Sequence, residues 1–314
     1  MTLAILFSPQ GSQAPGMGRE LAGLSAGARE AFEVADATLG WPVSATCWDG
    51  PAERLNDTRQ TQPCLLTTSV AAYRALAERV PVEPAFIAGH SVGEYAALVA
   101  AGVLELPAAL RLVQRRAELM AEADGEGGMA AVIGLDRDAV QIAVNAVARP
   151  TELVVANDNA PGQVVISGRR DALAAAEEAM RSSGARRILP LAVSGAFHSP
   201  LMGSVAEELA AAFDDEEWHD ARVPLVSNVT AEPLTDATRI RALLAEQVRS
   251  PVEWVAVVRR MAAEGVDMMI ECGAGTALVG MVRRIAPDVA TASVLDAETL
   301  DAASALLAAQ AVSA

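Results

Sequence analysis

The chain has few cysteines and few aromatic residues. Among its 314 residues are 3 cysteines, and Phe, Trp and Tyr together account for 4% of the chain. Cysteines this few and this widely spaced build neither a disulfide framework nor a Cys-x-x-Cys metal site, which indicates reduced thiols and a cytoplasmic protein. Because aromatic side chains are scarce, Ala, Val and Leu must fill most of the core.

Positive charge is also scarce. The sequence has 24 Lys and Arg residues against 40 Asp and Glu residues, which gives a formal net charge of −16 at pH 7. A nucleic-acid-binding protein presents a broad basic surface, so this balance argues against a nucleic-acid partner. It leaves room for an acidic protein partner that docks on a local basic patch.

Long apolar runs are missing as well. The longest apolar stretch, residues 95–113, is interrupted by Glu105 and Pro107, and such a pattern is typical of a buried helix. The short apolar run at residues 1–7 has no basic leader and no cleavage site after it. We therefore expect a soluble protein with no membrane partner.

What the sequence does contain is a regular alternation of strand and helix patterns. Hydrophobic residues make up 52% of the chain and charged residues 20%, as in a globular protein. Strands are predicted at residues 3–7 and 85–90, and helical segments at 19–40, 62–80 and 92–104. This alternation predicts an α/β fold with a mainly parallel sheet.

The middle of the chain follows a different pattern. Residues 125–193 show the order β-α-β-β-α-β, which is that of a ferredoxin-like α+β domain, and the glycine-rich residues 124–128 mark a boundary before it. We therefore predict a large α/β catalytic domain formed by residues 1–124 and 194–314, with a small ferredoxin-like domain inserted at 125–193.

The sequence Gly-His-Ser-Val-Gly at residues 89–93 fits the pattern Gly-x-Ser-x-Gly. It follows a predicted strand and precedes a predicted helix, which is the context in which this motif exposes a nucleophilic serine. Ser91 would then lie at a helix N-terminus, where partial positive charge suits a developing oxyanion. The alternative is that Ser91 only caps the helix in a tight turn.

A serine hydroxyl needs a base to take its proton, and the chain has 3 histidines. His90 adjoins Ser91 and is expected to be structural, whereas His219 lies in an acidic, solvated stretch. His198 follows a predicted strand and is the candidate base. In a catalytic triad an acidic residue orients the histidine, but none between Ser91 and His198 stands out for this role. Because a backbone carbonyl can orient an imidazole equally well, a Ser–His dyad is predicted.

Arg116 is a candidate anchor for a negatively charged group. It lies on the predicted helix that follows the helix after Ser91. Its planar guanidinium can donate two parallel hydrogen bonds to one carboxylate. The alternative is a surface ion pair, which is the ordinary role of a residue such as the neighbouring Arg115.

Seven motifs occur in order along the chain: QGSQAPGMG, TQPCLLTTSVAAY, GHSVGEYAALVAAGVL, RRAELM, APGQVVISG, VSGAFHSPLM and SPVEW. Together they resemble the malonyl-CoA:acyl-carrier-protein transacylases and the related acyltransferase domains of fatty-acid and polyketide synthases. The resemblance covers essentially residues 3–298. It implies an α/β-hydrolase-like large domain, a ferredoxin-like insertion and an active site in the cleft between them.

The resemblance also implies roles for individual residues. Ser91 matches the acylated serine, His198 its base, and Arg116 the residue that holds the free carboxylate of the malonyl group. Gln247 matches the position whose main chain orients the histidine.

Five more positions have a role by resemblance or depart from the family pattern. Gln10 and Val92 match the two residues whose backbone N–H groups form the oxyanion hole, and Gln62 matches a polar residue that lines the cleft. Phe197, before the histidine, favours malonyl over methylmalonyl, or is an ordinary packed aromatic. Pro9 stands where the family commonly has glycine, so the turn must differ here if that position needs positive φ.

The activity implied is malonyl transfer from malonyl-CoA to the phosphopantetheine thiol of an acyl carrier protein for fatty-acid synthesis, by a ping-pong mechanism without metal or redox cofactor. The alternatives are a trans-acting polyketide-synthase acyltransferase, an esterase or thioesterase, and a non-catalytic protein that binds the carrier. Three arginine pairs could receive an acidic carrier: residues 169–170, 186–187 and 283–284.

Overall fold

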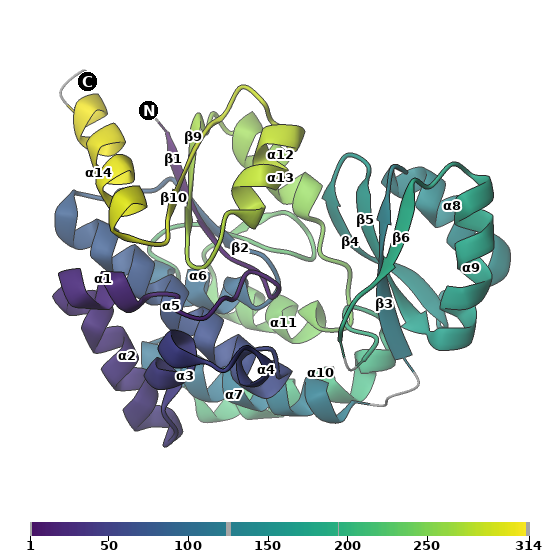
Figure 1. The fold of residues 1–314 in the computed structure, drawn as a ribbon, viewed down its shortest axis with the longest axis horizontal. Coiled ribbons are helices and arrows are strands. Elements are labelled where there is room, and N and C mark those ends of the chain that lie inside the picture. Colours follow the sequence, from purple (N-terminus) through teal and green to yellow (C-terminus); the bar gives the residue numbers. More distant parts are fainter. Residues whose placement is uncertain (1, 124–126, 194, 312–314) are drawn as a thin grey trace.

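A computed structural model describes residues 2–123, 127–193 and 195–311. The fold has two sheets, each with its own helices, which lie side by side in Figure 1. The larger sheet has six strands in the order β10-β9-β1-β2-β7-β8. All its pairs are parallel except β7 with β8, so the predicted α/β fold with a mainly parallel sheet is confirmed. Its strands are β1 (Leu3–Phe7), β2 (Phe86–Gly89), β7 (Leu225–Val226), β8 (Pro233–Leu234), β9 (Met268–Cys272) and β10 (Ala290–Val294).

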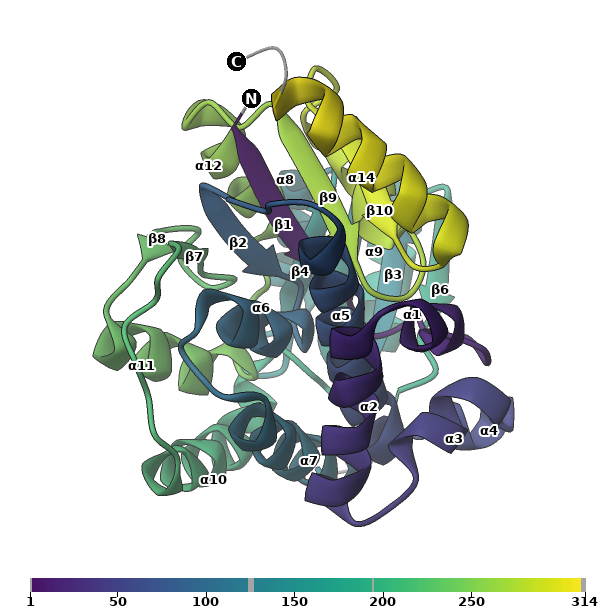
Figure 2. The same ribbon diagram turned by 90° about the vertical axis from the view of Figure 1, so that its left-hand side faces the viewer.

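Strand β1 lies inside this sheet, and its side chains alternate between two separate cores. Ile5 and Phe7 pack into the core on the side of helices α2, α5 and α6, whereas Ala4 and Leu6 pack with Trp254 on the side of α12 and α13. Helices therefore cover both faces of the sheet, as Figure 2 shows, and this explains why the strand reads as a continuous apolar run.

The helices around this sheet are α1 (Arg19–Leu24), α2 (Ala26–Leu39), α3 (Val43–Asp49), α4 (Ala52–Leu55), α5 (Thr58–Arg79), α6 (Gly93–Ala101), α7 (Leu106–Glu122), α10 (Gly203–Ala212), α11 (Ala237–Gln247), α12 (Trp254–Ala263), α13 (Ala277–Ile285) and α14 (Ala297–Ala311). None of the helices in the described ranges is long and apolar enough to cross a lipid bilayer. The three cysteines are buried and free.

The single helical segment predicted for residues 19–40 is instead two helices, α1 and α2. Ser25 separates them, because its backbone is extended and its side chain accepts a hydrogen bond from the backbone N–H of Ala28. A serine that caps a new helix ends the previous one. The predicted end at Gly40 is correct, and this glycine adopts a left-handed φ of 71°.

The smaller sheet has four antiparallel strands in the order β4-β5-β3-β6. Along the chain its elements follow the predicted order β-α-β-β-α-β, with both helices packed on one face over a separate apolar core. Its elements are β3 (Gly127–Ile133), α8 (Arg137–Val147), β4 (Leu153–Ala160), β5 (Gln163–Arg169), α9 (Arg170–Ser182) and β6 (Arg187–Pro190).

Backbone pairing joins β4 of the small sheet to the segment just before α12. Val252, just before α12, forms a parallel bridge with Asn157, and its backbone N–H and C=O bond to Ala156 and Asp158 at 2.8 and 3.0 Å. Next to this bridge, the guanidinium of Arg137 on α8 donates two hydrogen bonds to Glu253. This pairing holds the edge strand β4 over the carboxyl end of the large sheet, where β2 ends.

Candidate active site

The sequence Gly-His-Ser-Val-Gly forms the turn between β2 and α6, and both of its glycines are required by close backbone contacts. A Cβ atom on Gly93 would lie 2.3 Å from the carbonyl oxygen of Phe7, and one on Gly89 would lie 2.0 Å from the carbonyl of Gly93. Ser91, between them, has a left-handed φ of 53°. Such a strained, sharp turn is the local structure that projects a serine at the top of a parallel sheet.

Asn228, which the sequence analysis missed, holds this turn in place. Its Oδ1 accepts a hydrogen bond from the backbone N–H of Ser91 at 2.7 Å, and its Nδ2 donates to the carbonyl of Gly89 at 2.7 Å. The side chain is fully buried and comes from the turn after β7. It is 137 residues from Ser91 in the chain, so no local pattern could have identified it.

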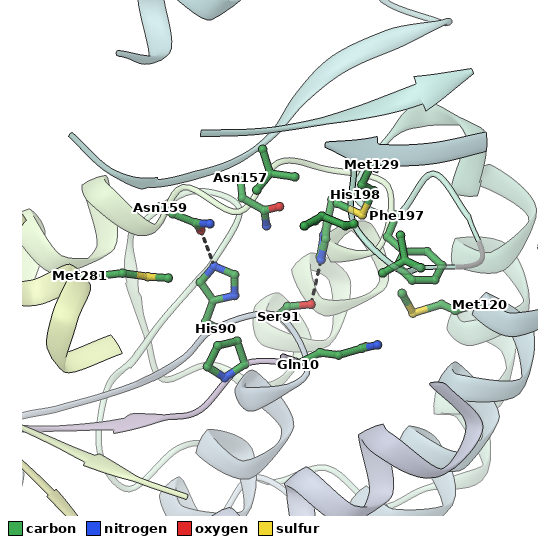
Figure 3. Close-up of a pocket in the computed structure, with 14 residues that line it drawn as sticks. Gln10, His90, Ser91, Met120, Met129, Asn157, Asn159, Phe197, His198 and Met281 are labelled. Atoms are coloured by element: carbon green, nitrogen blue, oxygen red, sulfur yellow. Dashed lines mark hydrogen bonds between the residues drawn. The ribbon is translucent and has the colours of Figure 1, made fainter. Parts of the chain in front are cut away.

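Ser91 and His198 face each other across the pocket, as Figure 3 shows, with 2.8 Å between Oγ and Nε2. The other ring nitrogen, Nδ1, donates to the carbonyl oxygen of Gln247 at 2.9 Å. Because a carbonyl oxygen only accepts, this contact places the proton on Nδ1 and leaves the Nε2 lone pair facing the hydroxyl. The structure thus brings together the three residues that the sequence analysis grouped as nucleophile, base and orienting carbonyl.

Burial and the nearby positive charge keep the imidazole neutral. Loss of water and the Arg116 guanidinium together lower the pKa of His198 from its usual value to about 3. The ring is therefore unprotonated at neutral pH, which is the form a general base must have before it takes a proton.

Arg116 reaches the same serine from α7. Its side chain is 1% exposed, and Nη2 lies 3.1 Å from Ser91 Oγ and 3.2 Å from Oε1 of Gln247, while Nη1 donates to Oε1 of Gln62 at 2.6 Å. Its guanidinium also lies 5.8 Å from the centre of the Tyr95 ring. Within the described ranges no carboxylate forms an ion pair with it, so two neutral amide oxygens hold a buried positive charge.

The surface alternative considered for Arg116 applies to its neighbour instead. Arg115 points outward and pairs with Glu208 at 2.6 Å, where both side chains are about half exposed. The two arginines are consecutive on α7, so they face different sides of the helix.

Gln62 lies elsewhere than expected. We expected it to line the cleft, but it is fully buried on α5 and is not among the residues that line the pocket. Its amide accepts from Arg116 through Oε1 and contacts the sulfur of Met120 through Nε2 at 3.4 Å. It therefore acts on the pocket through the two residues that it contacts, Arg116 and the pocket-lining Met120.

The turn after β1 forms one wall of the pocket through Pro9 and Gln10. The left-handed conformation in this turn belongs to Gly11, with φ 98°, so the position of Pro9 does not require glycine in this chain. Among the described residues, no acceptor is paired with the backbone N–H of Gln10 or with that of Val92 at the start of α6. Two free N–H groups thus border the serine.

The pocket lies between the two sheets and has a cavity volume of about 160 Å³. In Figure 3, Phe197, Met120 and Met129 lie together beside His198, and this side of the pocket is apolar. Asn157 and Asn159 reach in from β4 of the small sheet.

His90 is buried, as expected for a structural residue, but it also lines the pocket. Its Nε2 pairs with Oδ1 of Asn159 at 2.8 Å, and its ring packs against Trp254. Burial lowers its pKa to about 4. His219, which we expected to be solvated, is exposed.

Fold and site together define a class: α/β proteins that carry a Ser–His pair at a strand–turn–helix elbow, the arrangement of serine acyl-transfer enzymes. A family model described as acyl transferase domain matches residues 5–302. The malonyl CoA-acyl carrier protein transacylase of Bacillus subtilis is 43% identical over 304 residues, which are 96% of each chain.

Solved structures agree. An acyl carrier protein S-malonyltransferase from Vibrio cholerae superposes with a TM-score of 0.94 at 41% identity, covering 96% of this chain and 100% of the other. A malonyl-transacylase solved in complex with a type II polyketide synthase acyl-carrier protein gives a TM-score of 0.93 at 39% identity, covering 96% and 99%. The chain belongs to the acyltransferase family that these proteins represent.

Replacing Asn228 tests how far the elbow depends on it. Asn228→Ala leaves one buried N–H and one buried C=O without a partner, and each costs about 1–3 kcal/mol. We expect the free energy of unfolding, measured by urea denaturation, to fall by about 2–6 kcal/mol. The control is Asn56→Ala, which removes an exposed hydrogen bond to Gln13. Equal effects of the two substitutions would contradict the role of Asn228.

The protonation state of the buried histidines can be read directly by NMR of protein labelled with ¹⁵N-histidine. A free histidine, with a pKa of about 6.5, is mostly charged at pH 5.5. The depressed pKa values of His90 and His198 predict that both rings stay neutral at pH 5.5. The variant His219→Asn assigns the third signal. Protonation of either buried ring above pH 6 would show that the site is more polar than the structure indicates.

Proposed function

We propose that this protein transfers a malonyl group from malonyl-CoA to the phosphopantetheine thiol of an acyl carrier protein, through a malonyl ester on Ser91. The observation that carries the proposal is the buried guanidinium of Arg116, which has no carboxylate partner in the described ranges and lies 3.1 Å from the Ser91 hydroxyl. A malonyl group bound to Ser91 would bring a free carboxylate to this charge. An acetyl group would not.

The first half of the reaction follows from the Ser–His geometry. Nε2 of His198 takes the proton of Ser91 Oγ as the oxygen attacks the thioester carbonyl. The free N–H groups of Gln10 and Val92 are proposed to bind the oxyanion, and the loss of one such donor typically costs about 10²–10³ in rate. When the C–S bond breaks, His198 returns the proton to the CoA sulfur, and the malonyl-serine ester remains.

The second half repeats these steps in reverse with a new thiol. The phosphopantetheine thiol of the carrier gives its proton to His198 and attacks the ester carbonyl, and Ser91 then regains its proton. The steps use side chains and backbone N–H groups of this chain, and we propose that no metal or redox cofactor takes part. The carbonyl of Gln247 stabilises the imidazolium that forms in each half.

The partner is proposed to be an acidic acyl carrier protein in the cytoplasm, as part of fatty-acid synthesis. Basic groups at residues 169–170, 186–187 and 283–284 are the candidate contacts on this acidic protein. Of these, Arg186 and Arg187 are exposed, whereas Arg284 already binds Gln163 and the carbonyl of Pro161 in the small sheet. Supply of a polyketide synthase is the second candidate, favoured by the similarity to the malonyl-transacylase solved with a polyketide carrier.

The architecture proposed for this activity has two domains. Residues 1–124 and 194–314 form an α/β-hydrolase-like domain that supplies the elbow, the base and the arginine. Residues 125–193 form a ferredoxin-like domain, and the strand order β4-β5-β3-β6 supports this assignment. The pocket between them favours neither esterase nor thioesterase activity, since neither reaction needs a buried arginine at the serine.

Loading of the serine tests the proposal directly. The protein is incubated separately with malonyl-CoA, methylmalonyl-CoA and acetyl-CoA, and intact-mass spectrometry shows which acyl group is loaded. We expect one malonyl adduct per chain from malonyl-CoA, and none on Ser91→Ala. Carrier proteins from fatty-acid and from polyketide synthesis, added afterwards, should remove the adduct at different rates. Rapid loss of the adduct to water without a carrier would instead indicate a thioesterase.

Arg116→Ala tests the choice of acyl group. Because truncating one partner of a buried charged pair costs about 2–5 kcal/mol, kcat/KM for malonyl-CoA should fall by roughly 30- to 5000-fold. Transfer from acetyl-CoA should fall much less, so the preference shifts toward acetyl. Arg115→Ala, on the exposed side of the same helix, is the control. An unchanged malonyl preference in Arg116→Ala would refute the carboxylate-binding role.

A further inference from the structure

One buried carboxylate near the site has no part in the mechanism above. Glu94 lies in the first turn of α6, three residues after Ser91, and its side chain is 3% exposed. It is not among the residues that line the pocket. Burial raises its pKa to about 7. Burying a carboxylate costs free energy unless hydrogen bonds compensate for the lost water.

Glu94 contacts the side-chain amide of Gln247. Nε2 of Gln247 donates to Oε2 of Glu94 at 2.5 Å and to the backbone carbonyl of Ser91 at 3.0 Å. Both oxygens accept hydrogen bonds. When the side-chain carboxyl group of Glu94 is protonated, its C=O oxygen is still an acceptor. The amide can therefore adopt only one orientation, with its nitrogen toward Glu94 and its oxygen away from it.

That orientation decides what Arg116 meets. With the nitrogen of Gln247 held, its Oε1 faces Nη2 of Arg116 at 3.2 Å. The opposite orientation would set amide N–H groups against guanidinium N–H groups and an amide oxygen against two acceptors. Gln247 also carries the carbonyl that binds His198, so one residue contacts both the base and the arginine.

The contact matters most after the serine is acylated. In the structure Nη2 is held by two oxygens, Oγ of Ser91 and Oε1 of Gln247. Acylation converts Oγ into an ester oxygen, which is a weaker acceptor than a hydroxyl. From that point Gln247 is the protein group that fixes Nη2, while Gln62 fixes Nη1.

We propose that Glu94 is a positioning residue for acyl-group selection: it locks the amide of Gln247 so that the amide oxygen aims Nη2 of Arg116 at the acyl group on Ser91. The inference rests on the proposed function, since it assigns Glu94 a role in the choice of malonyl over acetyl. Glu94 acts through Gln247 and does not touch the substrate.

The test compares kcat/KM for malonyl-CoA and acetyl-CoA in two variants. Glu94→Ala removes the acceptor, and we expect the malonyl-to-acetyl ratio to fall at least about tenfold, as for loss of a hydrogen bond that orients a charged group. Glu94→Gln keeps an acceptor oxygen for Nε2 of Gln247, so it should retain the ratio to within about threefold. Glu94→Asp, which withdraws the oxygen by one methylene and keeps the charge, should behave like alanine and serves if Glu94→Ala does not fold.

Glu271 offers a matched control. It is also a fully buried carboxylate whose pKa burial raises to about 7, but it binds Ser8 and the N–H of Val279, with no link to Arg116. Glu271→Ala should lower stability and both activities without changing the malonyl-to-acetyl ratio. In the background of Arg116→Ala, Glu94→Ala should leave the ratio unchanged, because the group that it positions is gone.

The outcomes separate this inference from the proposed function. If the unaltered protein does not load malonyl, the proposed function is wrong. If it does, but Glu94→Ala lowers malonyl and acetyl transfer equally, Glu94 is only structural and the inference is overturned. The inference is also overturned if Glu94→Gln lowers the malonyl-to-acetyl ratio as much as Glu94→Ala does. It is likewise overturned if Glu94→Ala still changes this ratio in the Arg116→Ala background.

Discussion

The close approach of α6 to the end of β1 is the constraint on which the site depends. The backbone of Gly93 lies against the carbonyl of Phe7, where no Cβ fits. At this approach the turn after β2 is so sharp that Ser91 takes a left-handed φ. The backbone N–H of Val92, at the start of α6, has no acceptor among the described residues. Asn228 stabilises the turn by binding the backbone on both sides of His90. The position of Ser91 and the start of α6 therefore both depend on one packing contact.

The second determinant of the site is a positive charge held by neutral groups. A buried guanidinium is ordinarily paired with a carboxylate, but Arg116 is held by the amide oxygens of Gln62 and Gln247. The charge has two effects. It helps to keep His198 in its neutral form, and, without an ion-pair partner in the described ranges, it is available to an anionic acyl group. One arrangement thus serves both the chemistry and the selection that we propose.

The small sheet completes the pocket without supplying the Ser–His pair. Strand β4 is fixed to the large sheet through Val252, and from this strand Asn159 binds His90. The apolar side of the pocket combines Met129 on strand β3 with Met120 on helix α7 and Phe197 in the turn after β6. Ser91 stands at the end of β2 in the large sheet and His198 in the turn between β6 and α10, while residues of both parts of the fold line the pocket.

Local features of the sequence determined the alternation of strands and helices, the order of the central segment, the glycine elbow and the identity of its serine. These depend on periodicity and on backbone preferences within a few residues, and the family motifs placed His198, Arg116 and Gln247 beside them. Only the tertiary structure decided which groups surround Arg116, where Gln62 lies and that Asn228 and Glu94 support the site. Those contacts are hydrogen bonds, between two side chains or between a side chain and the backbone, that join residues 25 to 153 positions apart. Such contacts leave no periodic trace in the sequence, because they depend on how the packed sheets and helices bring buried polar atoms together.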